Sequence, residues 1–584
     1  NSFKADQETI IYSIMNNEDV VSVLPTGSGK SLCYQLPAVL KKGTTIVLSP
    51  LISLMQDQVM QLSKQGISAA FINSSNDMMD NEYIMQHMHE YKLVYISPER
   101  LTTPGFIDRL KQSNLSGFVI DEAHCISQWG HAFRPEYRSL SLIKEQFPTT
   151  PISAFTATAT PDVEKDISTQ LNMKNPVHIK ASFNRTNLTL KVYEKDNYRS
   201  QLETCLKAHK GASGIIYAST RKKVDRLFDD LKSKGLNVAR YHAGLSDQDR
   251  QRTLENFIYE KTDIVVATVA FGMGINKPNV RFVFHIDMPQ NIEQYYQEIG
   301  RAGRDGLASE CTMLYSLQDV VMQKKFADDV LEGSIRNQMK RKSDQMLALC
   351  NSTECRRKEI LKYFGEDFKQ TPCNHCDTCL EPAENMDGTI IAQKILSCVY
   401  KLQQRFGIGY VSDVLKGAKI KLILNRNHDK LSTYGLLSDF SKSELRHFIF
   451  SLINQGYLVV SDGDYPLLKL TQKSRDILFN NKEIFFKKRI VKAKNESSKK
   501  TDKKQTSFVS DDNYKLYMEL KTLRLALANK QNVPPYVIFH DKTLMEMAKN
   551  HPKTDSEFLE LNGVGPQKLA KYGKDFLDKI SETT

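Results

Sequence analysis

The sequence VVSVLPTGSGKS, at positions 20–31, runs from a short apolar strand into a glycine-rich loop and then into a helical pattern. Strand, loop and helix in this order are the context that a phosphate-binding P-loop requires. Glycines let backbone N–H groups approach a phosphate, and the dipole of the following helix adds to the attraction. The stretch therefore predicts an α/β fold that binds a nucleotide.

The loop assigns separate roles to its last two residues. Lys30 is expected to hold the β- and γ-phosphates, and Ser31 to help hold Mg²⁺. Leu24 stands where the strict P-loop pattern has its first glycine, so the match is to a looser variant. The predicted nucleotide-binding residues of the loop are Thr26, Gly27, Ser28, Gly29, Lys30 and Ser31.

A second motif, FVIDEAH at 118–124, is an apolar strand that ends in two carboxylates. Asp121 is expected to bind Mg²⁺ through water, and Glu122 to orient and deprotonate the attacking water. His124 follows as either a coupling residue or a plain polar cap. Together with the P-loop, this motif predicts nucleotide hydrolysis.

The length of 584 residues corresponds to about three to five folded units. Hydrophobic residues make up 40% and charged residues 25%, which excludes a globally disordered or collagen-like chain. Short β-branched runs alternate with helical patterns as far as about residue 330, which is typical of parallel sheets, and a break at 182–195 divides this region in two. A crevice between two such units is a natural ligand site.

The charge and the cysteines are unevenly spread. The formal net charge is +12, and ten cations against three acids give a net +7 to residues 482–504 alone. This Lys-rich stretch predicts a solvated linker or a segment that attracts phosphates. Half of the ten cysteines lie between Cys350 and Cys379, which favours a reduced compartment and one metal site over a disulfide scaffold. No stretch approaches the roughly 18 apolar residues of a membrane span, so no membrane partner is expected.

Four cysteines have the spacing of a metal site. Cys373, Cys376 and Cys379 are each separated by two residues, and Cys355 lies eighteen residues before them. Four thiolates form the tetrahedral set that a structural Zn²⁺ prefers. A closed four-thiolate site leaves no position for substrate, so this one is assigned to folding rather than catalysis. Two rival ligands lie nearby, Cys350 and His375.

Five motifs follow one another along the first 306 residues. They are PTGSGKS at 25–31, DEAHCISQWGHAFRPEY at 121–137, FTATAT at 155–160, VVATVAFGMGINKPNVR at 265–281 and QEIGRAGRDG at 297–306. With this order and spacing, the chain resembles the RecQ family of superfamily-two helicases. The resemblance implies two RecA-like domains that hydrolyse ATP in their cleft and move 3′ to 5′ along single-stranded DNA. It also implies that they unwind duplex or branched DNA in recombination, repair and replication-fork processing.

The resemblance assigns further residues to the nucleotide. Gln297, Arg301 and Arg304 lie in the segment that resembles the family's motif VI, where an arginine finger stabilises transition-state charge. Arg304 is the expected finger and Arg301 its neighbour, with a structural salt bridge as the alternative for either. Gln7 matches the adenine-reading glutamine, although Lys4 stands where the family usually has arginine.

The segment after DEAH resembles the family's aromatic-rich loop, which links DNA binding to hydrolysis. Aromatic faces stack on unpaired bases, and arginine adds cation–π or phosphate contacts. The expected DNA-binding residues of this loop are Trp129, His131, Phe133, Arg134 and Tyr137. Positions 156–158 resemble the motif that couples hydrolysis to domain movement. Further backbone contacts to DNA are expected at positions 49–51, 98–100, 220–221, 268 and 276–277.

The rest of the chain resembles the family's C-terminal modules. Cys355, which precedes Arg356, matches the family's remaining zinc ligand. Residues 406–470 resemble a winged helix whose implied ligand is duplex DNA near the fork, with a short hairpin predicted at Asp462-Gly463. Residues 561–568 resemble part of an HRDC domain, an auxiliary helical DNA binder.

The expected fold class is α/β, with two RecA-like parallel-sheet domains, a helical zinc-binding module, a winged helix and a small all-α HRDC domain. The expected boundaries are RecA-like domain 1 at 1–183, RecA-like domain 2 at 184–331, the zinc-binding module at 332–384, the winged helix at 385–483, a basic linker at 484–508 and the HRDC domain at 509–584.

The expected cofactors are ATP, Mg²⁺ and Zn²⁺. Expected partners are single-stranded, duplex and branched DNA, and a single-stranded-DNA-binding protein. A monomer is expected, in the bacterial cytoplasm at the nucleoid, or in the nucleus if the source is eukaryotic. One rival function is an RNA helicase, because DEAH also occurs in those. The other is a DNA-bridging scaffold with a degenerate nucleotide site, which the full set of expected catalytic residues disfavours.

Overall fold

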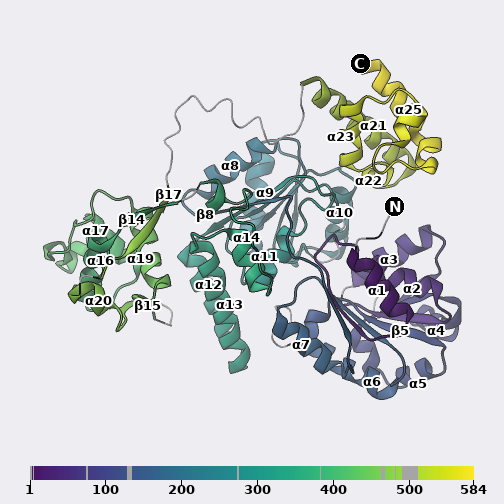
Figure 1. The fold of residues 1–584 in the computed structure, drawn as a ribbon, viewed down its shortest axis with the longest axis horizontal. Coiled ribbons are helices and arrows are strands. Elements are labelled where there is room, and N and C mark those ends of the chain that lie inside the picture. Colours follow the sequence, from purple (N-terminus) through teal and green to yellow (C-terminus); the bar gives the residue numbers. More distant parts are fainter. Residues whose placement is uncertain are drawn as a thin grey trace.

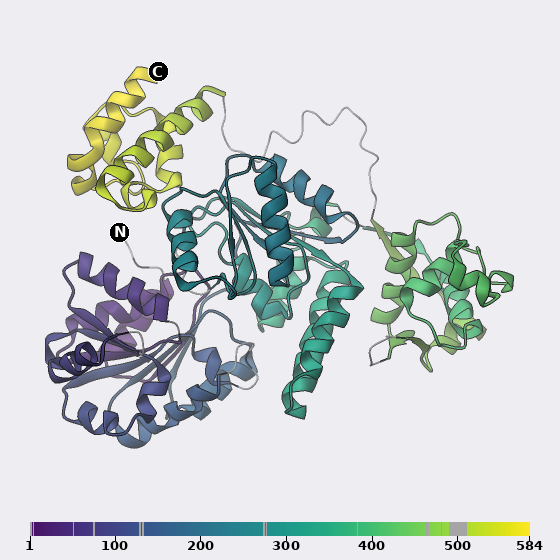
Figure 2. The same cartoon turned by 180° about the vertical axis from the view of Figure 1, so that it is seen from behind.

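The computed structural model describes residues 3, 5–50, 52–73, 76–127, 130, 134–272, 275, 277–381, 383–461, 467–480, 482–489 and 511–583. Lys4, Asn276 and the predicted Asp462-Gly463 hairpin lie outside these residues. Two α/β units form the centre of the molecule (Figure 1). A small mixed module lies at the end away from the first unit, and the C-terminal helices lie beside the two α/β units (Figures 1 and 2).

The first α/β unit is built on a parallel seven-stranded sheet with the strand order β3-β4-β2-β5-β6-β1-β7. Apolar and β-branched runs form its central strands because helices cover both faces and bury them completely. The strands are β1 (Val20–Val23), β2 (Thr44–Leu48), β3 (Ala69–Ile72), β4 (Leu93–Ile96), β5 (Leu115–Ile120), β6 (Ile152–Thr156) and β7 (Val177–Lys180).

Seven α-helices surround this sheet. They are α1 (Ala5–Met15), α2 (Lys30–Leu40), α3 (Ile52–Lys64), α4 (Met78–Gln86), α5 (Phe106–Lys111), α6 (Leu142–Gln146) and α7 (Pro161–Gln170). In α7, the Thr160 side chain accepts a hydrogen bond from Val163 N and Pro161 occupies the first turn, so the sequence itself sets where this helix begins. Between β5 and α6 the chain forms two short 3₁₀ segments, η3 (Ala123–Ile126) and η4 (Pro135–Ser141).

The second α/β unit has a parallel six-stranded sheet with the order β10-β11-β9-β12-β13-β8. Its strands are β8 (Leu188–Glu194), β9 (Gly214–Tyr217), β10 (Val238–Tyr241), β11 (Ile264–Ala267), β12 (Phe282–His285) and β13 (Ser309–Tyr315). Its helices are α8 (Tyr198–Ala208), α9 (Arg221–Ser233), α10 (Asp247–Ile258) and α11 (Ile292–Ile299). The expectation of two parallel-sheet domains is confirmed.

A helical segment follows, with α12 (Leu317–Asp328), α13 (Gly333–Asn351), α14 (Arg356–Tyr363) and α15 (Asp377–Leu380). It packs on the joint between the two units. Phe364 stacks on Phe183, with ring centroids 4.3 Å apart, and the Glu366 carboxylate accepts a 2.7 Å hydrogen bond from Phe183 N. Arg357 donates to Arg185 O and Leu188 O. The segment therefore holds the chain where it passes from one sheet to the next.

The mixed module has helices packed around small strands. Its helices are α16 (Thr389–Lys401), α17 (Ile408–Lys416), α18 (Lys421–Asn425), α19 (Lys442–Asn454) and α20 (Ser474–Phe479). Its strands are β15 (Leu458–Val460) and β16 (Leu468–Leu470), which form an antiparallel pair, and β14 (Ala383–Asp387) and β17 (Phe485–Arg489), which form another. Helices packed beside the small antiparallel pair of β15 and β16 are the arrangement expected of a winged helix.

The prediction that a basic linker begins at residue 484 is wrong for its first residues. β17 pairs with β14 from Asp387↔Phe485 to Ala383↔Arg489, so this stretch belongs to the mixed module. Phe486 is fully buried and its ring lies against Phe448, with centroids 4.9 Å apart. Two phenylalanines ahead of the lysines could have indicated this strand, but the high charge of the region favoured a linker.

The C-terminal module contains α21 (Asp511–Gln531), α22 (Pro535–Ile538), α23 (Asp541–Asn550), α24 (Asp555–Leu559) and α25 (Pro566–Thr583). These helices bury a hydrophobic core of their own, centred on Phe539, Phe558 and Phe576. The expected small all-α domain is confirmed.

Replacing Phe183 with alanine removes the ring that the helical segment stacks on. A loss of about 3 to 5 kcal/mol in the free energy of unfolding is expected for such a cavity, because the surrounding side chains relax only in part. Thermal melting followed by circular dichroism measures it, with Phe326→Ala as the control because Phe326 is largely exposed on α12. Equal melting temperatures for the two variants would contradict this role of Phe183.

Candidate functional site

The phosphate-binding loop has the backbone that its glycines predict. Gly27 and Gly29 adopt φ values of 83° and 87°, which are left-handed conformations that favour glycine. A Cβ atom at Gly29 would lie only 2.4 Å from the Gln7 side-chain nitrogen. Gln7 Nε2 donates a 2.9 Å hydrogen bond to Ser28 O, so the structure brings Gln7 to the loop. Ser31 lies in the first turn of α2, directly after Lys30.

The two carboxylates that end β5 face the lysine of this loop. Lys30 Nζ lies 3.5 Å from Asp121 Oδ1 and 3.5 Å from Glu122 Oε1. Burial acts to lower the pKa of Lys30, but the two carboxylates raise it above its ordinary value, so the ammonium stays charged. Burial, reinforced by Asp121, raises the pKa of Glu122 despite the nearby Lys30. A carboxylate with a raised pKa is a better general base.

His124 connects these carboxylates with the end of β6. Its Nδ1 lies 2.9 Å from Thr156 Oγ1 and 3.4 Å from Glu122 Oε2. Thr158 N in turn donates a 3.2 Å hydrogen bond to Thr156 Oγ1. His124 is fully buried, so it is no solvent-facing cap. The DEAH segment and positions 156–158 therefore form one hydrogen-bonded chain, as a coupling role needs.

The second α/β unit supplies the other wall of the site. Thr26 Oγ1 donates a 3.0 Å hydrogen bond to Gly300 O, which follows the last turn of α11. Gly27 faces Arg304, and a Cβ atom at Gly27 would lie 3.3 Å from Arg304 Cγ. Gln297 is half-buried in the same turn of α11. The motif predicted near residue 300 thus meets the P-loop directly.

Three arginines gather on this wall. Arg304 donates a 2.6 Å hydrogen bond to Ile275 O, and Arg301 donates to Gly272 O. Burial, together with Arg301 and Arg185, lowers the pKa of Arg304 to about 9. Crowded guanidinium groups gain strongly from an anion placed between them. Both Arg301 and Arg304 donate to backbone carbonyls, and neither forms an ion pair within the described residues, so the alternative role in a structural salt bridge has no support.

Arg185 is a site residue that the sequence did not indicate. It donates hydrogen bonds to Thr26 O at 3.2 Å, to Ala302 O at 2.9 Å and to Gly303 O at 3.0 Å. It therefore ties the P-loop to the second unit. Its position in the break between the two units gave no motif from which this role could be inferred.

These residues fit a nucleoside triphosphate with Mg²⁺. The left-handed glycines leave the backbone bare at the loop, and Lys30 with the buried Arg301 and the half-buried Arg185 and Arg304 supplies positive charge on two sides of it. Ser31 and Asp121 offer the oxygen ligands that Mg²⁺ prefers, from α2 and from the end of β5. Groups from both units would therefore surround the phosphates.

The structure describes part of the predicted DNA-binding loop. Trp129, His131 and Phe133 lie outside the described residues. Arg134 is half-buried and donates a 3.3 Å hydrogen bond to Pro50 O, within the predicted DNA contact at 49–51. The prediction for Tyr137 is wrong, because this residue is 1% exposed and its hydroxyl donates to Asp121 O at 3.3 Å. No base can stack on a buried ring, so Tyr137 instead supports the strand end beneath the carboxylates.

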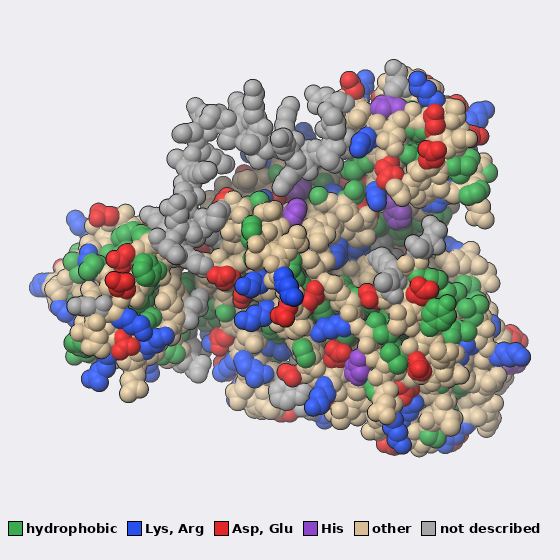
Figure 3. All heavy atoms as spheres, viewed as in Figure 1, with side chains coloured by type: hydrophobic (Ala, Val, Ile, Leu, Met, Phe, Trp, Pro, Cys, Tyr) green, Lys and Arg blue, Asp and Glu red, His purple; other side chains and the backbone are tan. Residues whose placement is uncertain are grey.

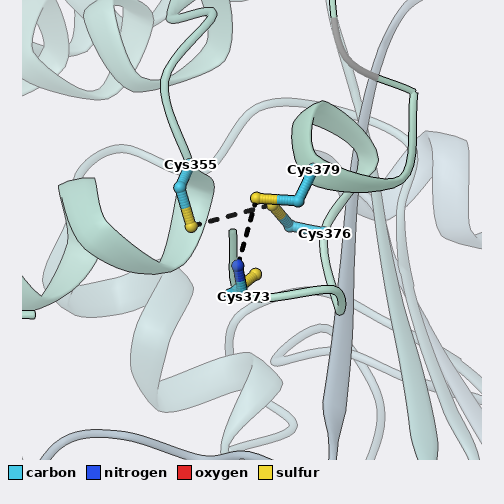
Figure 4. Close-up of side chains that lie close together, drawn as sticks. All are labelled: Cys355, Cys373, Cys376 and Cys379. Carbon is cyan, nitrogen blue, oxygen red and sulfur yellow. Dashed lines mark hydrogen bonds between the residues drawn. The ribbon is translucent and has the colours of Figure 1, made fainter. Parts of the chain in front are cut away.

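The four predicted zinc ligands come together (Figure 4). The sulfur atoms of Cys355, Cys373, Cys376 and Cys379 all lie within 4.8 Å of one another. Cys355 and Cys376 Sγ are 3.9 Å apart, close to the roughly 3.8 Å between thiolates around a tetrahedral zinc. Hydrogen bonds from the Cys355 and Cys373 thiols lower the pKa of Cys376, whereas hydrogen bonds to Cys373 and Cys376 raise the pKa of Cys355. The donor set fits Zn²⁺.

Neither rival ligand joins this cluster. Cys350 is buried near the end of α13 and is not among the grouped sulfur atoms. His375 contributes its backbone N–H, which donates to Cys373 Sγ at 3.4 Å. A buried ion pair between Arg356 and Asp377, at 3.0 Å, joins the start of α14 to α15 and so sets the ligands on the two helices side by side.

Comparison with known proteins agrees with this geometry. The matching families, by their descriptions, are DEAD/DEAH box helicase at 4–167, helicase conserved C-terminal domain at 197–306, RecQ zinc-binding at 317–380, RQC domain at 382–495 and HRDC domain at 514–580. A protein named ATP-dependent DNA helicase RecQ from Haemophilus influenzae is 42% identical over 100% of this chain and 94% of its own length. The chain belongs to the RecQ family.

A second RecQ relative, from Bacillus subtilis, is 40% identical over 99% of this chain and 96% of its own length. The RecQ-family chain therefore matches these relatives over nearly their whole length. ATP and Zn²⁺ are its cofactors, with Mg²⁺ as the usual partner of ATP. Among the described residues, no helix has the length and apolar character that crossing a membrane demands.

Replacing Cys355 with serine tests the ligand set. The variant is expected to lose most of its bound zinc and to melt at a lower temperature, because three thiolates hold Zn²⁺ less tightly than four. Atomic emission gives the zinc content per chain. Cys350→Ser is the matched control and should keep the full content. Equal zinc loss in both variants would exclude the ligand set proposed here.

Proposed function

We propose that this RecQ-family ATP-dependent DNA helicase hydrolyses ATP with groups from both α/β units and uses closure of their cleft to move 3′ to 5′ along one DNA strand. The observation that carries this proposal is the direct meeting of the P-loop with the segment at 300–304. Because each unit supplies part of the site, hydrolysis depends on how the units are placed. A change at the nucleotide thereby becomes a movement between the domains.

Each catalytic residue has a distinct task in this proposal. Lys30 holds the β- and γ-phosphates, and Glu122 takes the proton of the attacking water, which its raised pKa favours. Arg304 reaches the γ-phosphate as the finger, and Arg301 supports it. Ser31 and Asp121 would hold Mg²⁺, which would supply positive charge to neutralise the phosphate oxygens. Gln7 reads the adenine, and Gln297 lies where motif VI enters the cleft.

In this proposal, the loop after DEAH binds DNA and connects it to the nucleotide site. We place the stacking contacts at Trp129, His131 and Phe133, with Arg134 anchoring the loop to positions 49–51. His124 lies just before this loop in the chain. Its ring is 3.4 Å from Glu122 Oε2, and hydrogen bonds link it through Thr156 to Thr158. Binding of a strand can thus alter the position of Glu122. The mixed module would hold duplex or branched DNA ahead of the moving units.

Several finer assignments belong to the proposal. We propose that the chain acts as a monomer, because one chain supplies both walls of the nucleotide site. A single-stranded-DNA-binding protein is its proposed partner, since both act on the same strand. Its proposed place is the bacterial nucleoid, or the nucleus in a eukaryote, where its substrate lies. The expected boundaries are kept, except that the mixed module extends over residues 383–489.

The steady-state rate of ATP hydrolysis with Mg²⁺ tests the function. Single-stranded DNA is expected to raise the rate strongly in the wild type, and Glu122→Gln is expected to abolish turnover, because the amide cannot accept the proton. RNA of matched length is the comparison. Stronger stimulation by RNA would favour an RNA helicase, and DNA binding without turnover in the wild type would favour the scaffold.

A further inference from the structure

The C-terminal module contacts the second α/β unit through a buried cluster of charges. We call Glu260, Lys277, Asn279, Arg524 and Asp541 the interdomain cluster. The first three belong to the second unit, where Glu260 follows α10, and the last two lie on α21 and α23. Figures 1 and 2 both place these helices beside the α/β units.

Arg524 is the centre of the cluster. Its side chain is fully buried, and it donates to Asp541 Oδ1 at 2.7 Å within its own module. Its other terminal nitrogen lies 3.3 Å from Glu260 Oε1 across the interface. Asn279 Nδ2 donates to Glu260 at 2.8 Å and reaches Asp541 Oδ1 at 3.4 Å. Two separate contacts therefore cross from one module to the other.

Lys277 lies behind these contacts. Its side chain is 1% exposed, and its ammonium is 3.7 Å from Glu260 Oε1 and 5.2 Å from the centre of the Phe257 ring. No hydrogen-bond partner for this ammonium lies among the described residues. Burial lowers the pKa of Lys277 to about 8, although Glu260 and Asp541 oppose the shift. A lysine ammonium that lacks hydrogen-bond partners gains from contact with a phosphate.

Cations from both sides of the interface also act on Asp541 of the C-terminal module. Burial acts to raise the pKa of Asp541, but Arg524, Arg281 and Lys521 lower it to about 2. Arg281 belongs to the second unit and pairs with Asp305, the residue after Arg304. Whereas cations and anions alternate over the open face in Figure 3, here they are buried and paired. The cluster thus joins the C-terminal module to the segment that carries the proposed finger.

Groups of both α/β units act electrostatically on Tyr536 of the C-terminal module. Tyr536, on α22, is half-buried, and burial raises its pKa to about 12, with Asp57 on α3 and Tyr259 adding to the shift. Asp57 belongs to the first unit and Tyr259 to the second. α22 therefore lies where both units can affect it.

We infer that the C-terminal module is an ionic latch on the second α/β unit, which covers Lys277 and must release before that lysine meets a DNA phosphate. The docking rests on the contacts alone. The competition with DNA rests also on the proposed function and on the expectation that positions 276–277 contact the DNA backbone. Closure of the latch holds the segment from Asn279 to Asp305 in its present place.

Two variants open the latch from opposite sides. Glu260→Arg places a cation against Arg524 and Lys277. Lys521→Glu places an anion on α21 near Glu260 and Asp263. Burial raises the pKa of Asp263 and Lys521 opposes that shift, and Lys521 also helps to lower the pKa of Glu260. The variants change the net charge in opposite directions, so an effect that they share cannot come from net charge. Lys530→Glu is the matched control, because Lys530 is exposed at the far end of the same helix.

Small-angle X-ray scattering of the full chain without DNA, at low salt, measures the docking. The wild type and Lys530→Glu are expected to be compact, whereas Glu260→Arg and Lys521→Glu are expected to show a larger maximum dimension. Hydrogen exchange at 279–281 should rise in the same two variants, which keep the wild-type circular dichroism spectrum. An extended wild type, or two variants as compact as the control, would overturn the latch.

A DNA titration of the ATPase rate then tests the competition. Both variants are expected to reach half-maximal stimulation at about fivefold lower DNA concentration, a coupling of ordinary size between two sites. Release seen by scattering without any change in this concentration would overturn the competition. A wild type that DNA does not stimulate would contradict the proposed function, while the scattering would still decide the docking.

Discussion

The contact between the P-loop and the segment at 300–304 is the constraint on which the rest of the molecule depends. Thr26 donates to Gly300 O, and Arg185 donates to backbone carbonyls on both sides of the cleft. Neither sheet could form the nucleotide site alone, because the lysine and carboxylates come from one unit and the arginines from the other. The helical segment at 317–380 serves this contact by fixing the joint between the units around Phe183.

The charges around this contact explain how it responds to a nucleotide. Buried like charges are costly unless an anion lies among them, and the three arginines crowd beside a loop whose backbone is shaped for phosphate. In the proposed mechanism, a triphosphate would relieve that repulsion and pull both walls together, and its hydrolysis would weaken the pull. The buried chain from Glu122 through His124 to Thr158 lies on the same path. Chemistry and domain movement therefore use the same few groups.

The sequence predicted what local chemistry decides. The strand, loop and helix around Lys30, the strand ending at Asp121 and the spacing of the four cysteines each require particular residue types close together along the chain. The geometry of all three agrees with what was expected. The sequence did not predict the roles of Arg185, Phe486 and Arg524, because their partners lie far away along the chain. The partners of Arg185 and Arg524 are more than a hundred residues away, and that of Phe486 is several tens of residues away. Tyr137 was assigned wrongly because an aromatic ring in a polar motif gives no sign of its burial.

Single-turnover hydrolysis of ATP by Arg304→Ala, in the presence of single-stranded DNA, tests the central claim most directly. We expect nucleotide affinity close to that of the wild type and a rate of hydrolysis about a thousandfold lower, because an arginine finger acts on the transition state. Arg199→Ala, which removes an exposed arginine of the same unit, should hydrolyse ATP normally. Wild-type hydrolysis by Arg304→Ala would contradict the claim that both units complete the site.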